Sequence, residues 1–236
     1  MQLYKWLVVI PGMLLSTLLV CLLIIIFSAL GMQDFASRVL ATRWARLNML
    51  FILMTIEIVG FEKTITGQSY IIVSNHQSLV DIYVLYGYVG MDIRWVMKKE
   101  LRSIPVFGLA CEMMGQIIID RSNTQAAVAS INAARNKIKD GLSVIFFAEG
   151  TRSDDGEVER FKKGAFRLAV ELGVPILPVS IHDTNRVLPS NTLDWHPGHV
   201  KLKFHDPIPT DGLTSEHVLA LGEQTRDVIR RALRSG

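Results

Sequence analysis

The sequence predicts an α/β fold, a mixed and largely parallel sheet flanked by helices, behind an N-terminal membrane-associated helical segment. Short apolar runs rich in β-branched residues alternate with helix-like segments after residue 60, and this alternation is typical of parallel strand–helix–strand units. Half of the 236 residues are hydrophobic and only 20% are charged, with a mean hydropathy of +0.31. Much of the apolar excess lies near the N-terminus, which is why the membrane-associated segment is expected there.

The first expected element is an apolar helix at residues 7–32, where 26 consecutive positions carry no charge. About 20 helical residues cross the ~30 Å core of a bilayer, so this run is long enough. A buried core helix and a cleaved signal peptide are the alternatives; signal cores are ~7–15 residues long behind a basic stretch, whereas only Lys5 precedes this run. Whether the helix spans the bilayer or enters and returns stays open, because Pro11 and Gly12 near its start favour a kink.

A second apolar stretch, at 49–59, has 11 residues, which is too short to span a bilayer. It predicts a short amphipathic helix that lies at the membrane interface, enters the membrane and returns, or docks on the domain. Basic residues beside a membrane segment favour the cytoplasmic side, and three lie between the two stretches: Arg38, Arg43 and Arg46. We therefore expect residues 1–59 to form the membrane helix plus the short interfacial helix. Residues 60–236 are expected to form the α/β domain, on the cytoplasmic face of the inner cell membrane.

Each strand expected after residue 60 is a short apolar run bounded by polar or turn-forming residues. The expected strands are 71–73, 93–97, 116–119, 144–147, 176–181 and 200–204. Helices are indicated by a capping residue such as Ser78, by alanine-rich composition, or by a terminal glycine such as Gly141 or Gly173. The expected helices are 79–88, 105–114, 124–139, 161–172 and 215–233. The order of the strands in the sheet does not follow from this pattern.

Composition excludes several classes of function. A net charge of +3 is too small for the electrostatic footprint of nucleic-acid binding, so no nucleic-acid partner is expected. The two cysteines, Cys21 and Cys111, are too few for a disulfide scaffold or a cysteine-rich metal site. The sequence has no set of three closely spaced metal ligands, no Gly-x-Ser-x-Gly elbow and no phosphate-loop lysine motif. Neither a metal, nor a serine nucleophile, nor nucleotide hydrolysis is therefore expected.

A histidine and an aspartate follow the strand expected at 71–73, at the kind of strand-to-helix junction where open α/β sheets bind ligands. If residues 76–81 were all helical, His76 and Asp81 would lie about 140° apart, so they meet only if His76 precedes the helix. The carboxylate then orients one imidazole nitrogen and leaves the other to accept a proton as a general base. This spacing also arises by chance, so the pair needs support from other residues.

Cationic residues follow three other expected strands. They lie in Lys98-Lys99, in Asp120-Arg121 and in the loop Ala148-Glu149-Gly150-Thr151-Arg152-Ser153. In the loop, Gly150 permits a close turn, Thr151 offers a hydroxyl, and Arg152 has a planar guanidinium fork that suits a phosphate. Any one of these cations alone is more often a solvated surface charge. Three at strand ends indicate a shared anion site.

Four blocks of residues occur in the order and approximate spacing of the glycerolipid acyltransferases. The blocks are Asn75-His76-Gln77-Ser78-Leu79-Val80-Asp81, Gly115-Gln116-Ile117-Ile118-Ile119-Asp120-Arg121, Phe147-Ala148-Glu149-Gly150-Thr151-Arg152-Ser153 and Val174-Pro175-Ile176-Leu177-Pro178-Val179-Ser180. Over about residues 60–210 the chain resembles the 1-acylglycerol-3-phosphate O-acyltransferase, or lysophosphatidic acid acyltransferase, family. One departure is Ala148, where the family usually has proline.

The resemblance implies that residues 60–236 are an acyltransferase domain acting in phospholipid biosynthesis at a membrane. It implies transfer of a fatty acyl group, from acyl-CoA or acyl carrier protein, to the 2-hydroxyl of lysophosphatidic acid, giving phosphatidic acid. His76 would be the general base and Asp81 its partner, with no covalent acyl-enzyme, cofactor or metal. The residues expected to bind the phosphate and glycerol are Glu149, Gly150, Thr151, Arg152, Arg121, Lys98 and Lys99.

Two alternatives stay open at this point. A related acyltransferase acting on another lysophospholipid or lyso-lipid acceptor has the same histidine and aspartate, so motifs do not separate the two. A non-catalytic, membrane-bound lipid-binding protein with the same fold is the other. It is disfavoured by the presence of four polar motif residues, His76, Asp81, Glu149 and Arg152.

Overall fold

The computed structural model describes residues 2–120, 138, 141–153 and 156–235. Within these residues lies a seven-stranded sheet with the order β1-β7-β6-β2-β5-β3-β4. The strands are β1 (Met54–Val59), β2 (Ile71–Ser74), β3 (Ile93–Lys98), β4 (Ile117–Ile119), β5 (Ser143–Phe147), β6 (Ile176–His182) and β7 (Gly198–Phe204). Neighbouring strands are parallel except for β6 and β7, which run antiparallel. The predicted fold class, mixed and largely parallel, is confirmed.

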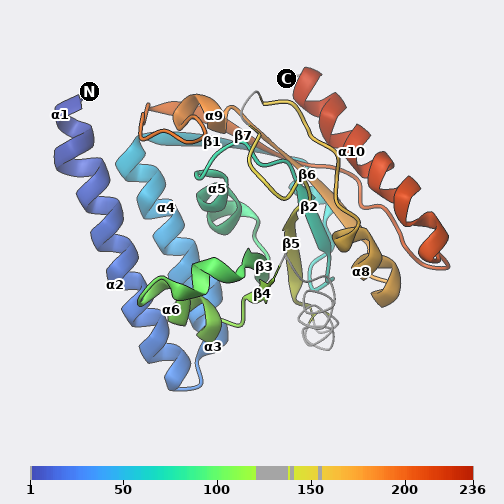
Figure 1. Cartoon of the computed structure of the whole chain (residues 1–236), viewed down its shortest axis with the longest axis horizontal. Coiled ribbons are helices and arrows are strands. Elements are labelled where there is room, and N and C mark those ends of the chain that lie inside the picture. Colours follow the sequence, from blue (N-terminus) through green and yellow to red (C-terminus); the bar gives the residue numbers. More distant parts are fainter. Residues whose placement is uncertain (1, 121–137, 139–140, 154–155, 236) are drawn as a thin grey trace.

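Helices cover both faces of this sheet (Figure 1). On one side lie α2 (Ile10–Ala29), α4 (Ala41–Ile52), α5 (Asp81–Tyr88) and α6 (Phe107–Met113), and on the other α8 (Gly164–Leu172) and α10 (Val218–Ser235). Strand β2 packs against the helices on both faces of the sheet, because successive side chains of a strand point to opposite faces. Ile72 belongs to the apolar core on the α5 side, whereas Ile71 and Val73 belong to the core on the α8 side. The carboxyl end of β2 is thereby fixed between two packed layers.

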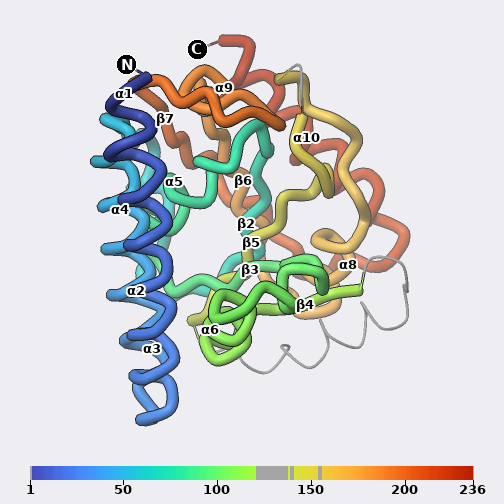
Figure 2. Tube along the Cα trace, turned by 60° about the vertical axis from the view of Figure 1, so that its left-hand side comes forward, coloured from blue at the N-terminus to red at the C-terminus, as the bar shows by residue number. Residues whose placement is uncertain are grey.

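The N-terminal helices form a hairpin that lies against the α5 side of the domain (Figure 2). Helix α1 (Gln2–Tyr4), a π-helical turn (Lys5–Val9) and α2 make one continuous helix of 28 residues. After a turn, α3 (Gln33–Phe35), a second π-helical turn (Ala36–Leu40) and α4 run back beside it. In the described part of the chain, Gln2–Ala29 is the one helix long and apolar enough to cross a membrane. The predicted N-terminal helix is thus confirmed, and its insertion into a membrane stays a prediction.

The interfacial helix predicted at residues 49–59 is wrong. Helix α4 ends at Ile52, Leu53 takes a left-handed conformation with φ of 59°, and Met54–Val59 form β1. Strand β1 pairs with β7 at the edge of the sheet, so the sheet begins at Met54. Thr55 and Glu57 alternate with apolar residues, and this period of two is typical of a strand. The prediction relied on the length of the apolar stretch and overlooked that alternation; the division of the chain at residue 59 stays a prediction.

The other expected elements that the structure describes all form, with shifted ends. Helix α5 begins at Asp81 instead of residue 79, and α10 follows a short 3-10 turn (Ser215–His217). A short helix, α9 (Thr184–Val187), follows β6. The helix expected at 124–139 lies outside the described residues except for Ile138, and Arg121 lies outside them entirely.

Candidate active site

His76 and Asp81 meet at the carboxyl end of β2. The His76 Nδ1 atom lies 2.8 Å from Oδ2 of Asp81, whose side chain is fully buried. His76 belongs to the turn between β2 and α5, and Asp81 is the first residue of α5, so the carboxylate reaches back to the imidazole as the sequence predicts. A carboxylate at Nδ1 favours the tautomer with the proton on Nδ1, because the carboxylate only accepts hydrogen bonds. The lone pair of Nε2 is then available to take a proton.

The Asp81 carboxylate also fixes the backbone of the turn. Its Oδ2 accepts hydrogen bonds from the amides of Gln77 at 2.8 Å and Ser78 at 2.9 Å. The Ser78 hydroxyl donates to the carbonyl of Leu188 at 2.7 Å and accepts from the amide of Val80 at 3.3 Å. One buried carboxylate therefore orients the imidazole and holds the backbone of the turn ahead of α5 at once.

The loop after β5 braces the other side of the turn. The His76 amide donates to Oε1 of Glu149 at 2.8 Å, and the His76 carbonyl accepts from the amide of Ser153 at 2.8 Å. The Asn75 side chain pairs with both backbone groups of Ile181 at 2.9 Å. Both backbone groups of His76 are thus held by residues far away in the sequence, which fixes where the imidazole points.

Glu149 lies behind the turn, with its carboxylate occupied by backbone amides. Its second oxygen, Oε2, accepts from the Glu159 amide at 2.9 Å, and the residue is only 5% exposed. Burial raises the pKa of this carboxyl to about 7, against the opposing effect of its two backbone hydrogen bonds. Glu149 is not among the residues that line the cavity described next, so its predicted contact with substrate stays a prediction.

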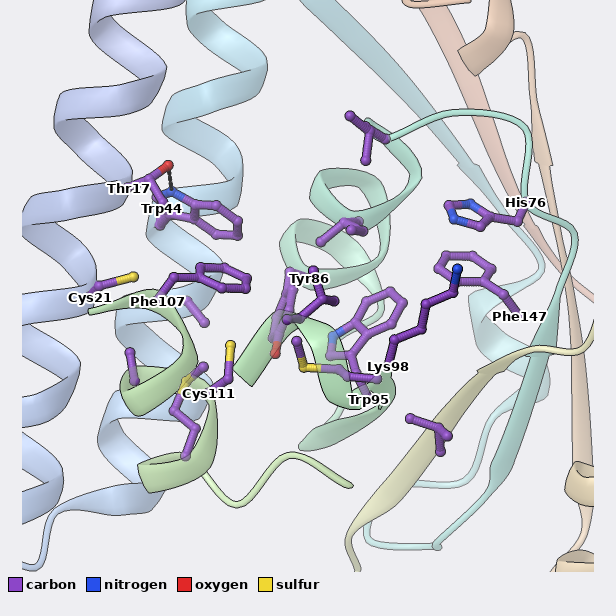
Figure 3. A pocket seen from close by; sticks show the side chains of 18 of the residues that line it. Thr17, Cys21, Trp44, His76, Tyr86, Trp95, Lys98, Phe107, Cys111 and Phe147 are labelled. Atoms are coloured by element: carbon purple, nitrogen blue, oxygen red, sulfur yellow. Dashed lines mark hydrogen bonds between the residues drawn. The ribbon is translucent and has the colours of Figure 1, made fainter. Parts of the chain in front are cut away.

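A cavity of about 590 Å³ opens beside His76 and extends between β3, α5 and α6 to the N-terminal hairpin (Figure 3). At one end it is lined by His76, Lys98 and the segment 150–152, and deeper by mostly apolar side chains. Those deeper residues include Cys21, Trp44, Tyr86, Trp95, Phe107 and Cys111. A mostly apolar cavity of this size with a few polar groups at one end is typical of a small-molecule site, and its shape suits a hydrocarbon chain.

Aromatic rings connect the histidine with the interior of the cavity. The His76 ring stacks on Phe147 with centroids 3.7 Å apart and an interplanar angle of 7°. The ring centroids of Phe147 and Trp95 lie 5.2 Å apart, and those of Trp95 and Tyr86 lie 5.3 Å apart. Phe147 and Trp95 are not predicted site residues, because in the sequence each is an apolar residue of a buried strand. Only the packing of β3 against β5 brings them to one wall.

The predicted cations are placed differently from one another. Arg152 and Lys98 both line the cavity, and the Arg152 guanidinium donates to Oδ1 of Asn191 at 3.4 Å. Lys99 instead forms an ion pair with Asp120 at 2.6 Å, and this carboxylate raises the pKa of the Lys99 ammonium. The structure thus brings Lys98, Gly150, Thr151 and Arg152 together with His76 and directs Lys99 elsewhere. Their roles in binding stay predictions.

Among the described residues, the other reactive side chains near the cavity do not form a second centre. Burial raises the pKa of the Cys111 thiol to about 12, which leaves little of the nucleophilic thiolate near neutral pH. In the described part of the chain, no group of three or more His, Cys, Asp or Glu side chains lies close enough to hold a metal ion. A histidine–aspartate pair beside an apolar cavity with cations at its entrance is suited to acyl transfer from a lipid-like donor to a phosphorylated alcohol.

Known proteins are similar to this chain in sequence and in fold. Residues 55–182 match the Acyltransferase family of domains. The chain is 35% identical over 171 residues to a chloroplastic 1-acyl-sn-glycerol-3-phosphate acyltransferase of Brassica napus, covering 72% of this chain and 49% of that one. It is 33% identical over 172 residues to the human 1-acyl-sn-glycerol-3-phosphate acyltransferase alpha, covering 72% and 61%. The chain therefore spans about half to three fifths of the length of these relatives.

A solved structure is similar over nearly its whole length. The 1-acyl-sn-glycerophosphate (LPA) acyltransferase PlsC of Thermotoga maritima matches with a TM-score of 0.69 and 29% sequence identity. The match covers 94% of this chain and 97% of that one, so it includes the N-terminal hairpin as well as the sheet.

Proposed function

The chain belongs to the acyltransferase family that its residues 55–182 match, and from that membership we propose that it transfers a fatty acyl group from an acyl thioester to the 2-hydroxyl of 1-acylglycerol-3-phosphate. The product is phosphatidic acid, the donor is acyl-CoA or acyl carrier protein, and no cofactor or metal takes part. The observation that carries the proposal is the His76–Asp81 pair at the entrance of an apolar cavity that Arg152 and Lys98 also line. Relatives that match over most of this chain bear the name of this activity.

In the proposed reaction His76 acts as general base. Its Nε2 accepts the proton of the 2-hydroxyl while that oxygen attacks the thioester carbonyl carbon, and Asp81 stabilises the resulting imidazolium. The new C–O bond gives a tetrahedral intermediate, from which the C–S bond breaks and the thiolate leaves with the proton held by His76. No acyl-enzyme forms. Positive charge from Arg152 and Lys98 holds the acceptor's phosphate, and the apolar cavity takes a hydrocarbon chain.

The N-terminal helix supports a membrane location. Its most apolar 18-residue window has a mean hydropathy of 2.8, and only 22% of that window is buried inside the molecule. Leu14, Leu15 and Leu18 are about half exposed or more. Exposed apolar surface of this extent is costly in water and stable in lipid, where acceptor and product also reside. We assign the chain to the inner cell membrane with its α/β domain on the cytoplasmic face.

The assignment of the face depends on the three arginines of the returning segment, Arg38, Arg43 and Arg46. Two of them contact the α/β domain: Arg38 pairs with Asp92 at 3.2 Å, and Arg46 donates to the carbonyl of Gly87 at 2.8 Å. Arg43 is exposed. Labelling of an engineered surface cysteine in intact cells and in inverted vesicles tests the face directly, and labelling from outside intact cells would contradict the cytoplasmic assignment.

The activity is tested with the full chain purified in a mild detergent, by the release of free thiol from acyl-CoA or acyl carrier protein. We expect release to depend on added 1-acylglycerol-3-phosphate and phosphatidic acid to appear in equal amount. The alternative is an acyltransferase for another lysophospholipid or lyso-lipid acceptor, and it is favoured if such an acceptor stimulates release while 1-acylglycerol-3-phosphate does not. No release with any acceptor contradicts the proposal.

A further inference from the structure

The positive charge at the cavity entrance comes from side chains of only a few segments. A phosphate monoester carries a charge of about −1.5 to −2 near neutral pH. Of the predicted cations, Lys99 is already paired with Asp120. Arg152 and Lys98 line the cavity, and neither has an ion pair with a carboxylate among the described residues. A further positive group, Lys162, lies beside the loop that carries Arg152.

Lys162 folds back over that loop. A Cβ atom built on Gly150 would come within 2.6 Å of the Lys162 Nζ, 2.7 Å of its Cε and 3.1 Å of its Cδ. The end of the lysine side chain therefore lies directly over Gly150, where any other residue would displace it. The φ of Gly150 is +84°, a conformation that glycine adopts readily. Glycine at this position thus serves both the turn and the approach of the lysine.

The backbone holds Lys162 in the same place. Its amide donates to the carbonyl of Ala148 at 2.8 Å, which ties the segment ahead of α8 to the loop after β5. The lysine is exposed, and among the described residues it forms no ion pair with a carboxylate. The carboxylate of the adjacent Glu149 accepts from the amides of His76 and Glu159 instead. An ammonium with no carboxylate partner among the described residues therefore lies against Gly150, which lines the cavity beside Arg152, whereas Lys162 itself is not one of the lining residues.

We propose that Lys162 binds a phosphate group of a substrate at the cavity entrance, together with Arg152. The inference rests on the proposed function, because it needs a phosphorylated substrate. The acceptor's glycerol phosphate and the phosphates of the donor's carrier share the required chemistry. Lys162 is a binding residue and not a proton-transfer group, so its removal weakens substrate binding more than it slows the chemical step.

The test compares Lys162→Gln with Lys163→Gln in the full chain. Lys163 is the exposed neighbour of Lys162, and the three atoms nearest to a Cβ built on Gly150 all belong to Lys162, so Lys163 is a matched control for a general loss of positive charge. We expect Lys162→Gln to raise KM for 1-acylglycerol-3-phosphate about tenfold, the loss typical of one charge-assisted contact near solvent. We expect kcat to change less than twofold, Lys163→Gln to behave as the wild type, and Lys162→Arg to restore most of the affinity.

Separate titrations of the two substrates identify the source of the phosphate. A rise in KM for the acceptor, together with weaker inhibition by glycerol 3-phosphate, assigns Lys162 to the acceptor. A rise in KM for acyl-CoA or acyl carrier protein alone assigns it to the donor. The proposal is overturned if neither KM changes, or if Lys162→Gln and Lys163→Gln have equal effects. Failure of the proposed function is seen separately, as a wild-type chain that does not acylate 1-acylglycerol-3-phosphate.

Discussion

The catalytic turn, residues 75–81, and the cationic rim of the cavity, Lys98 and residues 150–152, are built in opposite ways. The turn is held by hydrogen bonds from several directions, and its carboxylate Asp81 is fully buried. In the rim, Thr151 and Lys98 are exposed, and Arg152 has a long contact of 3.4 Å to Asn191.

This difference follows from what each region has to do. A general base has to meet the proton at a defined distance and angle, so its orientation is best fixed before the substrate arrives. A phosphate is attracted by charge over several ångströms, and exposed cations still allow the product to leave. Substitutions in the turn are therefore expected to lower kcat, and substitutions in the rim are expected to raise KM.

The largest effect is expected from His76→Asn. The asparagine keeps a polar side chain but cannot accept the proton, so we expect kcat to fall about 10²–10⁴-fold, the usual contribution of a general base. The measurement is steady-state thiol release with a saturating acceptor.

A second histidine–aspartate pair provides the control for this substitution. His196 Nε2 lies 3.0 Å from Asp194, and both side chains are about half exposed, away from the cavity lining. His196→Asn should leave kcat unchanged. A kcat of His76→Asn within threefold of the wild type would mean that His76 is not the base.

The next largest effect is expected on the free energy of unfolding, from Glu149, whose carboxylate accepts the amide of His76 behind the turn. Burial raises the pKa of Glu149 to about 7 from its ordinary value of 4.5, so the folded state keeps a proton that the unfolded state releases between these pH values. The stability that the folded state gains by keeping this proton is fully present below about pH 4.5. This stability is lost as the pH rises through about 7. We expect Glu149→Gln to remove up to about 3 kcal/mol of this pH dependence.

The measurement is urea unfolding in a mild detergent at several pH values between 4.5 and 8. Relative to the wild type, Glu149→Gln should become more stable as the pH rises. The control is Glu62→Gln, since Glu62 is exposed and is not among the charged groups that shift the pKa of Glu149. A constant difference between Glu149→Gln and the wild type would show that ionisation of Glu149 costs the folded state nothing.

In the rim, Arg152→Gln should have a smaller effect, on binding. We expect KM for 1-acylglycerol-3-phosphate to rise about tenfold with a much smaller change in kcat, because the guanidinium acts on the phosphate and not on the reacting atoms. Arg186→Gln is the control, since Arg186 is highly exposed and pairs with Asp183. An equal fall of kcat and kcat/KM would place Arg152 with the turn instead of the rim.

The sequence was sufficient for the alternation of strands and helices and for the meeting of His76 with Asp81. Both depend on local information: apolar periodicity, and a carboxylate in the first turn of the following helix. The prediction for residues 49–59 did not include the edge strand β1, because it was based on the length of the apolar stretch. The alternation of Thr55 and Glu57 with apolar residues indicates the strand. Strand order was out of reach because it depends on contacts between distant segments.

The cavity and the brace could not be predicted for the same reason. Glu149 looks like a substrate ligand in the sequence, since it stands beside Gly150 and Arg152, yet its carboxylate accepts from the amides of His76 and Glu159. Only the parallel pairing of β2 with β5 brings these groups together. Residue type and spacing thus predicted the meeting of His76 with Asp81 and the candidate cations, but three-dimensional packing decides which of these side chains face the cavity.

The smallest effect is expected from a substitution in the apolar wall of the cavity. This substitution distinguishes the role of the cavity from the roles of the turn and the rim. Ala110 on α6 lines the cavity and is 1% exposed, so Ala110→Leu adds three carbon atoms inside it. We expect the ratio of kcat/KM for a long-chain donor to that for a short-chain donor to fall about threefold, because lost room costs a long chain more. Thiol release with acyl-CoA donors of graded length measures this ratio, with Leu109→Ala, exposed on the same helix, as the control. If Ala110→Leu slows donors of all lengths equally, the substitution has disturbed the catalytic turn, and the cavity is not an independent binding surface.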